Sequence, residues 1–409
     1  MILVRNLRQL LSGNKLVGLL ALVGLIAACS PKITTNPVKK EIEGKIAEKP
    51  ATKFTEGHIS VFIPFKLNQF NSKTVTKSQI GKADMALDFY QGLMLGIDSA
   101  ANLGLNFKVN VFDSRDDNSQ LAILTKKETV KTSHLIIGPV FPDGLKYMTN
   151  FSIANDLPIV SPLAASKRSE FDNPNLISVV NDIDQHGVKI ADYMAKHNKA
   201  ENCIVVLINT KKAVDEQFAL PIRRQFAQKY PNYIVQEYTS TYAFETKMMK
   251  GKKYLVVLCS SDVPFVTPSL SKLYKLKTLN TTGYDIQLFG HPNWAKQAYN
   301  VDQLQGLNTI ISTSYRVDYK RKDVIEFVRS YRAKYEFEPS EYAFKGFDIG
   351  LYFGQLLAKH GARYLDFLTK DGYKGLHNSF DFEFDPQYGY FNKHLMLLQY
   401  RNLSLDLIE

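Results

Sequence analysis

The stretch HLIIGPVFPDG, residues His134 to Gly144, begins with a short apolar run and then changes character abruptly. A Gly-Pro pair and a Pro-Asp-Gly triplet follow the apolar residues, and both are turn signals. A short apolar run bounded in this way is typical of a strand buried in a parallel sheet. We therefore expect a buried strand that ends in a stiff loop.

The same pattern recurs on both sides of this stretch. From His58 onward, short apolar runs alternate with longer amphipathic runs, which is the βαβ order of a parallel sheet covered by helices. The expected strands of the first series are HISVFIPF (58–65), NFKVNVFD (106–113), HLIIGPV (134–140), LPIVSPL (157–163) and ISVVND (177–182). Between the first two, apolar residues from Ala83 to Ile97 recur at spacings of three and four, which predicts a helix with one apolar face.

A second series with the same order begins near residue 183. Its expected strands include NCIVVLIN, NYIVQEYTS, KKYLVVLCSSD, DIQLFGH and GLNTIISTSY. Two consecutive helices follow, and FDFEFD with KHLMLLQYRNLSLDLI is expected to close the chain as an antiparallel hairpin across Gly389. With 409 residues, the chain is long enough for two α/β lobes, each built on a doubly wound, Rossmann-like parallel sheet.

The first thirty residues indicate export. Arg5, Arg8 and Lys15 precede the uncharged run LVGLLALVGLIAA (16–28), which is too short to span a bilayer comfortably. Ile26-Ala27-Ala28-Cys29 resembles the lipobox of bacterial lipoproteins, which implies that Cys29 is lipidated. The alternatives are a simple signal peptide or a short membrane anchor.

The next segment, up to residue 57, is rich in lysine, glutamate and proline and has Phe54 as its one aromatic residue. Such a composition predicts a solvated tether. The SPKI after Cys29 lacks an acidic cluster, which favours an anchor facing the periplasm, with the outer membrane preferred. The predicted organisation is a lipoprotein signal peptide at 1–28, a lipid-anchored tether at 29–57, a first lobe at 58–180 plus 316–370, and a second lobe at 181–315 plus 371–409.

Besides Cys29, the chain has Cys203 and Cys259. Cys203 opens its expected strand and Cys259 closes another. In neighbouring parallel strands these positions would lie on the order of 15 to 20 Å apart, which is beyond disulfide reach. We interpret both as buried free thiols, with a disulfide or a metal role as the alternative.

The formal net charge is +11. Lysine and arginine clusters occur at 211–212, 247–253, 272–277 and 320–322. Export excludes nucleic acid as a partner, and no recognition motif accompanies the clusters. They are interpreted as solvated helix faces, or as surfaces attracted to anionic lipid or an envelope polymer.

The order of elements resembles the type I periplasmic binding proteins, which include the branched-chain amino acid receptors of ABC transporters. The resemblance covers His58 to Glu409. It depends on five stretches taken in order, namely LIIGPV, LPIVSPLAAS, NLISVVNDIDQHGVKIADYM, LQGLNTIISTSY and KGFDIGLYFGQLL. The resemblance implies two lobes joined by a three-strand hinge, with ligand bound in the cleft between them.

Loops at the carboxyl ends of the strands are then expected to touch the ligand, as in other open α/β sheets. Gly138-Pro139-Val140-Phe141 would be one such loop and residues 161–166 another, although turn formation without a ligand role is an alternative. The predicted ligand-binding residues are Phe141, Ser161, Ala164, Ala165, Asp182, Asp262 and Trp294. For Trp294, packing between the lobes is an alternative interpretation.

Two loops depart from the pattern of amino acid receptors. Val140, Phe141, Pro142 and Asp143 replace the hydroxyl residues that usually follow the Gly-Pro, and Asn209-Thr210-Lys211-Lys212 replaces an aromatic residue and a glycine. Both departures count against an amino acid ligand. They point to the lipoproteins that activate penicillin-binding proteins, which have the same fold and a Leu-x-Gly segment like Leu304-Gln305-Gly306.

No sequence motif for catalysis, a metal or a cofactor is found, so an enzyme is not expected. The acidic run Asp113 to Asn118 lacks the glycine and the downstream glutamate of a calcium loop, and it is interpreted as a strand end and a helix cap.

The function favoured at this point is a membrane-anchored substrate-binding component of an ABC transporter, which captures a small solute, amino acid or peptide-like, by hinge closure and works with a permease. The alternative is a regulator that binds a peptidoglycan synthase.

Overall fold

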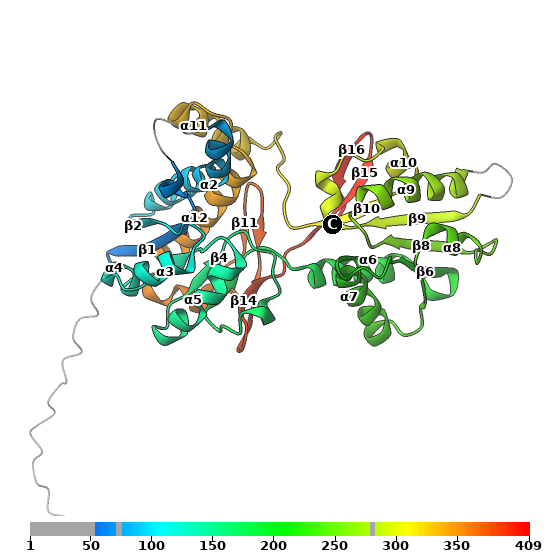
Figure 1. Ribbon diagram of the computed structural model, residues 1–409, viewed down its shortest axis with the longest axis horizontal. Helices are drawn as coiled ribbons and strands as arrows, with labels where there is room; N and C mark the ends of the chain where they lie inside the picture. Colours follow the sequence, from blue (N-terminus) through cyan, green and yellow to red (C-terminus); the bar gives the residue numbers. More distant parts are fainter. Residues whose placement is uncertain (1–53, 71–75, 279–282) are drawn as a thin grey trace, which may run out of the picture. The chain divides into compact units, whose positions relative to one another are not determined.

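The computed structural model describes residues 54–70, 76–278 and 283–409. Its strands form two separate seven-stranded sheets and one two-stranded ribbon. The two large sheets, with the helices that cover them, are called the first and second lobes (Figure 1). The predicted signal peptide and the tether up to residue 53, including Cys29, lie outside the described residues.

The first sheet has the order β13-β14-β5-β4-β3-β1-β2. Its central strands are parallel, and β13 pairs antiparallel with β14 at one edge. The bounds are β1 (Glu56–Ile63), β2 (Asn106–Asp113), β3 (Leu135–Ile137), β4 (Ile159–Ser161), β5 (Leu176–Ser178), β13 (Phe382–Asp385) and β14 (Gly389–Asn392).

Alternate side chains of these strands enter two different hydrophobic cores. Ile59, Val61 and Ile63 pack on one face with α2 and α12, whereas Phe62 packs on the other face with α3 and α5. Figure 1 shows the two helix layers on this sheet. The helices of this lobe are α2 (Lys77–Ala101), α3 (Asn118–Leu124), α4 (Glu128–Lys131), α5 (Pro142–Ala154), α11 (Lys322–Tyr335) and α12 (Glu341–His360), with 3-10 turns η1 (Leu67–Gln69), η2 (Arg168–Glu170) and η5 (Gly361–Phe367).

The second sheet has a similar plan with the order β16-β15-β10-β9-β8-β6-β7, but β15 pairs antiparallel with β10. Ile204, Val206 and Ile208 face one core, and Cys203, Val205 and Leu207 face the other. The strand bounds are β6 (Cys203–Ile208), β7 (Ile234–Tyr238), β8 (Lys253–Leu258), β9 (Asp285–Gly290), β10 (Ile310–Thr313), β15 (Met396–Arg401) and β16 (Ser404–Leu407). The helices are α6 (Ile183–His197), α7 (Ala213–Lys229), α8 (Thr241–Glu245), α9 (Val263–Thr278) and α10 (Val301–Gly306), with 3-10 turns η3 (Ala200–Asn202) and η4 (Pro292–Lys296).

The chain passes from one lobe to the other three times. The crossovers follow β5, β10 and β14, and they lie near residues 179–182, 314–316 and 393–395. The predicted fold class, two doubly wound lobes with a three-strand hinge, is therefore confirmed. The two-stranded ribbon of β11 (Tyr373–Lys374) and β12 (Ser379–Phe380) precedes the third crossover.

The end of the chain differs from the expectation. We predicted one hairpin of FDFEFD with the last strands, and we assigned residues 371–409 to the second lobe. Instead, β13 pairs with β14 in the first sheet, and β15 and β16 form a separate hairpin in the second sheet. Each hairpin thus extends a different sheet at its edge.

Both buried cysteines are free thiols, as predicted. Cys203 is paired in register with Lys253, whereas Cys259 follows Leu258 at the opposite end of that neighbouring strand. No helix among the described residues is both long and apolar enough to cross a bilayer.

Candidate functional site

The loop after β3 is shaped by its glycine and by the helix that follows it. Gly138 has a φ of +91°, and a Cβ atom there would lie 2.3 Å from the carbonyl oxygen of Phe62, so a side chain does not fit. Phe141 is the N-cap residue of α5 and is 37 % exposed, whereas Val140 is buried. The predicted ligand residue Phe141 therefore presents an apolar ring at the carboxyl edge of the first sheet.

The loop after β4 has a buried start and an open end. Ser161 is 1 % exposed, Ala164 packs against the core beside α3 and α5, and Ala165 is exposed. Of these three predicted ligand residues, Ala165 offers the most surface to a solute.

Asp182 lies in the first crossover and serves as a helix cap. Its carboxylate accepts the N–H of Gln185 at 3.0 Å, and the Gln185 side chain accepts the N–H of Asp182 at 3.0 Å, which is a reciprocal capping box at the start of α6. Burial raises the pKa of Asp182, and the bond from Gln185 acts against this rise. Asp182 also lines a cavity of about 460 Å³ with Lys167 and Arg168, which is within the size range of small-molecule sites.

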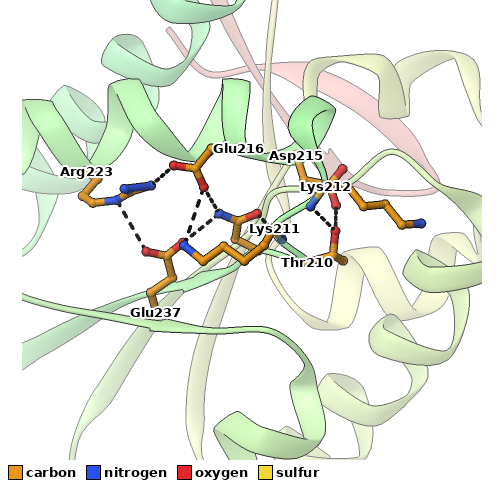
Figure 2. Close-up of polar contacts among 8 residues, drawn as sticks. Thr210, Lys211, Lys212, Asp215, Glu216, Arg223 and Glu237 are labelled. Atoms are coloured by element: carbon orange, nitrogen blue, oxygen red, sulfur yellow. Dashed lines mark hydrogen bonds and ion pairs between the residues drawn. The ribbon is translucent and has the colours of Figure 1, made fainter.

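In the second lobe, the loop after β6 is closed by a polar network with residues of α7 and β7 (Figure 2). The amide nitrogen of the fully buried Asn209 donates to Glu216 at 2.6 Å and to Glu237 at 2.7 Å. Lys211 binds Glu237 at 2.5 Å, and Arg223 contacts both glutamates. Burial acts to raise the pKa of Glu237, but bonds from Lys211 and Asn209 and the charge of Arg223 hold it below its usual value.

The rest of this loop is also paired. Thr210 donates its hydroxyl to Asp215 at 2.5 Å, and Lys212 forms an ion pair with the predicted ligand residue Asp262 at 3.2 Å. Asp262 is exposed. The polar side chains of this loop are thus already paired with neighbouring residues of the second lobe.

Trp294 does not reach the surface. It is 0 % exposed, its indole N–H donates to the carbonyl of Ser260 at 2.9 Å, and its ring packs in the core of the second lobe beside Tyr299. Gly290 leaves the space for this ring, because a Cβ atom there would lie 2.3 Å from it. Trp294 therefore anchors η4, the segment after β9, to the core of the second lobe and offers no surface to a ligand.

The structure also brings together charged residues that the sequence analysis missed. Lys296, at the end of η4 in the second lobe, contacts both carboxylate oxygens of Glu341 in α12 of the first lobe, at 3.0 and 3.2 Å. Lys345, one turn further along α12, binds the same carboxylate at 3.2 Å. Both lysines lie near the ring of Tyr315 in the second crossover.

No sequence signal marks this group, because its members come from three separate segments. Spacing reveals the i, i+4 pair Glu341 and Lys345 but not the approach of Lys296.

The acidic run after β2 has the structural role predicted for it. Asp117 caps α3 by accepting the N–H of Ser119 at 2.8 Å, and Asp113 accepts the N–H groups of Lys66, Leu67 and Arg115. Among the described residues, no cluster of three or more His, Cys, Asp or Glu side chains is arranged to hold a metal ion.

Comparison with known proteins gives similarity at the level of structure. No protein-family model and no curated protein matches the sequence. Among solved structures, a Rhodospirillum rubrum protein described as a branched-chain amino acid ABC transporter is 15 % identical, with a TM-score of 0.63, over 86 % of this chain and 100 % of that one.

Among further solved structures with a TM-score of 0.54 are the following two. An ABC transporter substrate-binding protein of Desulfitobacterium hafniense in complex with Leu is 14 % identical over 86 % of this chain and 100 % of that one. The C-domain of LpoA from Haemophilus influenzae, a regulator of PBP1A, is 12 % identical over 87 % of this chain and 100 % of that one. The two sheets and the three passages of the chain between them, together with these similarities, show that the chain has the fold of the type I periplasmic binding proteins.

Proposed function

We propose that the protein is an extracytoplasmic, lipid-anchored ligand-binding protein that captures a small solute between its lobes, as the substrate-binding component of an ABC transporter. The observation that carries this proposal is the pair of parallel sheets joined by three crossovers. In such sheets, ligands bind beyond the carboxyl ends of the strands. Solute-binding proteins of ABC transporters have the same fold.

Hinge closure follows from this arrangement. A solute that contacts the loops after β3 and β4 and also the loop after β9 touches both lobes only when they approach one another. Binding then shifts the population toward the closed form, which a permease can recognise. The side-chain donors of Asn209 already bind Glu216 and Glu237 and are not free for a ligand. We therefore assign ligand contact in the second lobe to η4.

Thermal unfolding of the chain against amino acids, peptides, sugars and muropeptides tests solute capture. A ligand that binds only the folded protein stabilises it by about 2.7 kcal/mol at one hundred times its dissociation constant. Ala165→Glu, at an exposed position of the loop after β4, should abolish the shift, whereas Gln217→Glu on the outer surface of α7 should preserve it. The absence of any shift across the library contradicts solute capture.

The second candidate is a regulator of peptidoglycan synthesis that binds a synthase. The specific observation that favours it is that the polar side chains of the loop after β6 are already paired within the second lobe, because a protein partner does not need the free donors that a small polar solute needs. The structural similarity to the LpoA C-domain supports this candidate as well. Retention of a peptidoglycan synthase by the immobilised full chain, with no solute shifting its unfolding midpoint, would favour regulation over transport.

We further propose that Cys29 carries the lipid anchor. Labelling with a radioactive fatty acid should mark the wild-type chain, and Cys29→Ser should remove the label and release the protein from the membrane fraction. Labelling that persists in Cys29→Ser would contradict this assignment.

A further inference from the structure

Two lysines from different lobes converge on a single carboxylate. Within the described residues, Lys296 and Lys345 each form an ion pair with Glu341 and with no other acidic residue. The group therefore holds two positive charges and one negative charge. The side chain of Lys345 is only 13 % exposed, and a buried ammonium group is costly unless it is paired.

An aromatic ring completes the group. The ammonium of Lys345 lies 4.5 Å from the centroid of the Tyr315 ring, and that of Lys296 lies 5.2 Å from it, both within cation–π range. The ring of His377 stacks on Tyr315 at 4.7 Å. Burial lowers the pKa of His377 to about 3, so this imidazole is neutral and does not add charge.

Polar atoms without partners lie close to this group. Nδ1 of His377 and Oδ1 of Asn378 are buried and have no hydrogen-bond partner among the described residues. Only Nδ1, in the tautomer that carries its proton, can donate to an anion, because the amide oxygen is an acceptor. Asn378 borders a small cavity of about 10 Å³ together with Lys345, Tyr315 and Pro162. Pro162 belongs to the loop after β4, so the group adjoins the loop that carries Ala165.

We propose that this cluster is the recognition site for an anionic group of the ligand, a carboxylate or a phosphate, and that Glu341 is the resident anion that the ligand replaces. The inference rests on the proposed capture of a solute between the lobes. Lys296 belongs to the second lobe and Lys345 to the first, so an anion bound by both holds the lobes together.

Glu341 is suited to leave this position. It is the first residue of α12, where the amino end of the helix stabilises a negative charge, and its side chain is 32 % exposed. It can therefore turn toward solvent without losing all of its stabilisation. The Tyr315 ring and the two ammonium groups then remain for the incoming anion.

Calorimetric titration of the full chain tests the assignment with three probes, namely N-acetylmuramic acid, N-acetylglucosamine and inorganic phosphate. The first two differ by the lactyl ether group and its carboxylate, so their comparison measures the effect of adding an anionic group, and phosphate tests the alternative anion. We expect one of the anionic probes to bind at least tenfold more tightly than N-acetylglucosamine.

Three variants and a control assign the binding to the cluster. Lys296→Met and Lys345→Met should each weaken binding of the anionic probe at least tenfold. Glu341→Gln removes the negative charge that competes with the probe, so it should strengthen binding severalfold. Lys320→Met is the charge control, because Lys320 is exposed and makes no ion pair with a described residue. If Lys345→Met does not fold, the variants of Lys296 and Glu341 still provide the test, because these side chains are partly exposed.

The outcomes separate this inference from the proposed function. If neutral solutes bind as tightly as anionic ones, or if anion binding is the same in Lys296→Met, the anion site is wrong and solute capture stands. If neither the probes nor the solute library binds the wild-type chain, solute capture fails as well.

Discussion

At the scale of single residues, Asp348 is the clearest case of a buried side chain that organises its surroundings. It is fully buried in α12, and it accepts the N–H groups of Leu376, His377 and Asn378 at 2.7 to 2.9 Å and the hydroxyl of Tyr373 at 3.1 Å. One carboxylate thus fixes the turn that leads toward the third crossover. Asp348 belongs to the stretch KGFDIGLYFGQLL, and this is its structural role.

Asp348→Asn should therefore destabilise the fold strongly. The amide keeps the shape of the carboxylate but faces N–H donors with an NH₂ group, and each buried donor left unsatisfied costs about 1 to 3 kcal/mol. We expect the free energy of unfolding in urea to fall by about 2 to 4 kcal/mol. Asp366→Asn, at a half-exposed carboxylate, is the control, and equal stability of the two variants would contradict this role.

Three buried histidines contribute strongly to the dependence of stability on pH. Burial lowers the pKa of His186 to about 3, of His291 to about 4 and of His377 to about 3. In the unfolded chain, each has an ordinary pKa near 6.5. Between the two values the unfolded state binds the proton and the folded state does not, so stability falls as the pH drops below 6.5.

Asp348 acts in the opposite direction. Burial raises its pKa to about 6, although the N–H bonds act to lower it, so between pH 3.8 and 6 the folded state binds more protons than the unfolded state. Each histidine contributes about 1.4 kcal/mol per pH unit to the slope of the unfolding free energy against pH. Asp348 contributes a slope of opposite sign, which cancels about one histidine's share.

His186→Gln should reduce the slope of unfolding free energy against pH by about one proton near pH 5. The matched control is His197→Gln, at an exposed position of the same helix, α6. Urea unfolding at several pH values between about 4 and 7.5 measures the slope. A slope in His186→Gln that equals the slope of the wild type would show that His186 is not held neutral in the fold.

At the scale of elements, α2 and α12 approach one another through glycines. A Cβ atom on Gly92 would lie 1.9 Å from the carbonyl oxygen of Ala343, and one on Gly350 would lie 2.4 Å from that of Leu93. The sequence pattern predicts one apolar face for this helix and does not indicate what its glycines contact. The structure shows that its glycines serve contact with a second helix about 250 residues away in the chain.

Gly350→Ala should destabilise the protein by about 2 kcal/mol or more, because the methyl group forces the helices apart in a packed core. Alanine in an open helix position has the opposite effect, a gain of up to about 1 kcal/mol over glycine. Gly81→Ala provides this control, since its Cβ atom would have one neighbour, at 3.7 Å. Equal stability of the two variants would contradict the close helix contact.

The order and type of the elements could be predicted from the sequence, because periodicity and turn residues are local signals. NFKVNVFD, for example, is β2 over the same residues. The pairing of FDFEFD could not be predicted. The strands β13 (FEFD) and β16 (SLDL) both alternate apolar and polar residues, and which sheet edge each hairpin extends depends on contacts that the local sequence does not contain.

At the scale of the whole molecule, the candidate site was predicted only in part. The loops were found because they follow buried strands, but the sequence does not distinguish an exposed side chain such as Ala165 from a buried one such as Trp294. The cluster of Lys296, Glu341 and Lys345 depends on how the two lobes meet. That information appears only after the three crossovers are in place.

The most direct test of the account is a distance measurement between the lobes. Cys203 and Cys259 are buried, so spin labels can be placed selectively at Lys146→Cys on α5 and Gln217→Cys on α7, both exposed, in a chain that carries Cys29→Ser. Pulsed electron paramagnetic resonance then compares the label distances with and without a solute that raises the unfolding midpoint. The account predicts a shift to one narrower distribution of changed mean distance when the solute binds. An unchanged distribution with the solute bound would contradict capture by hinge closure.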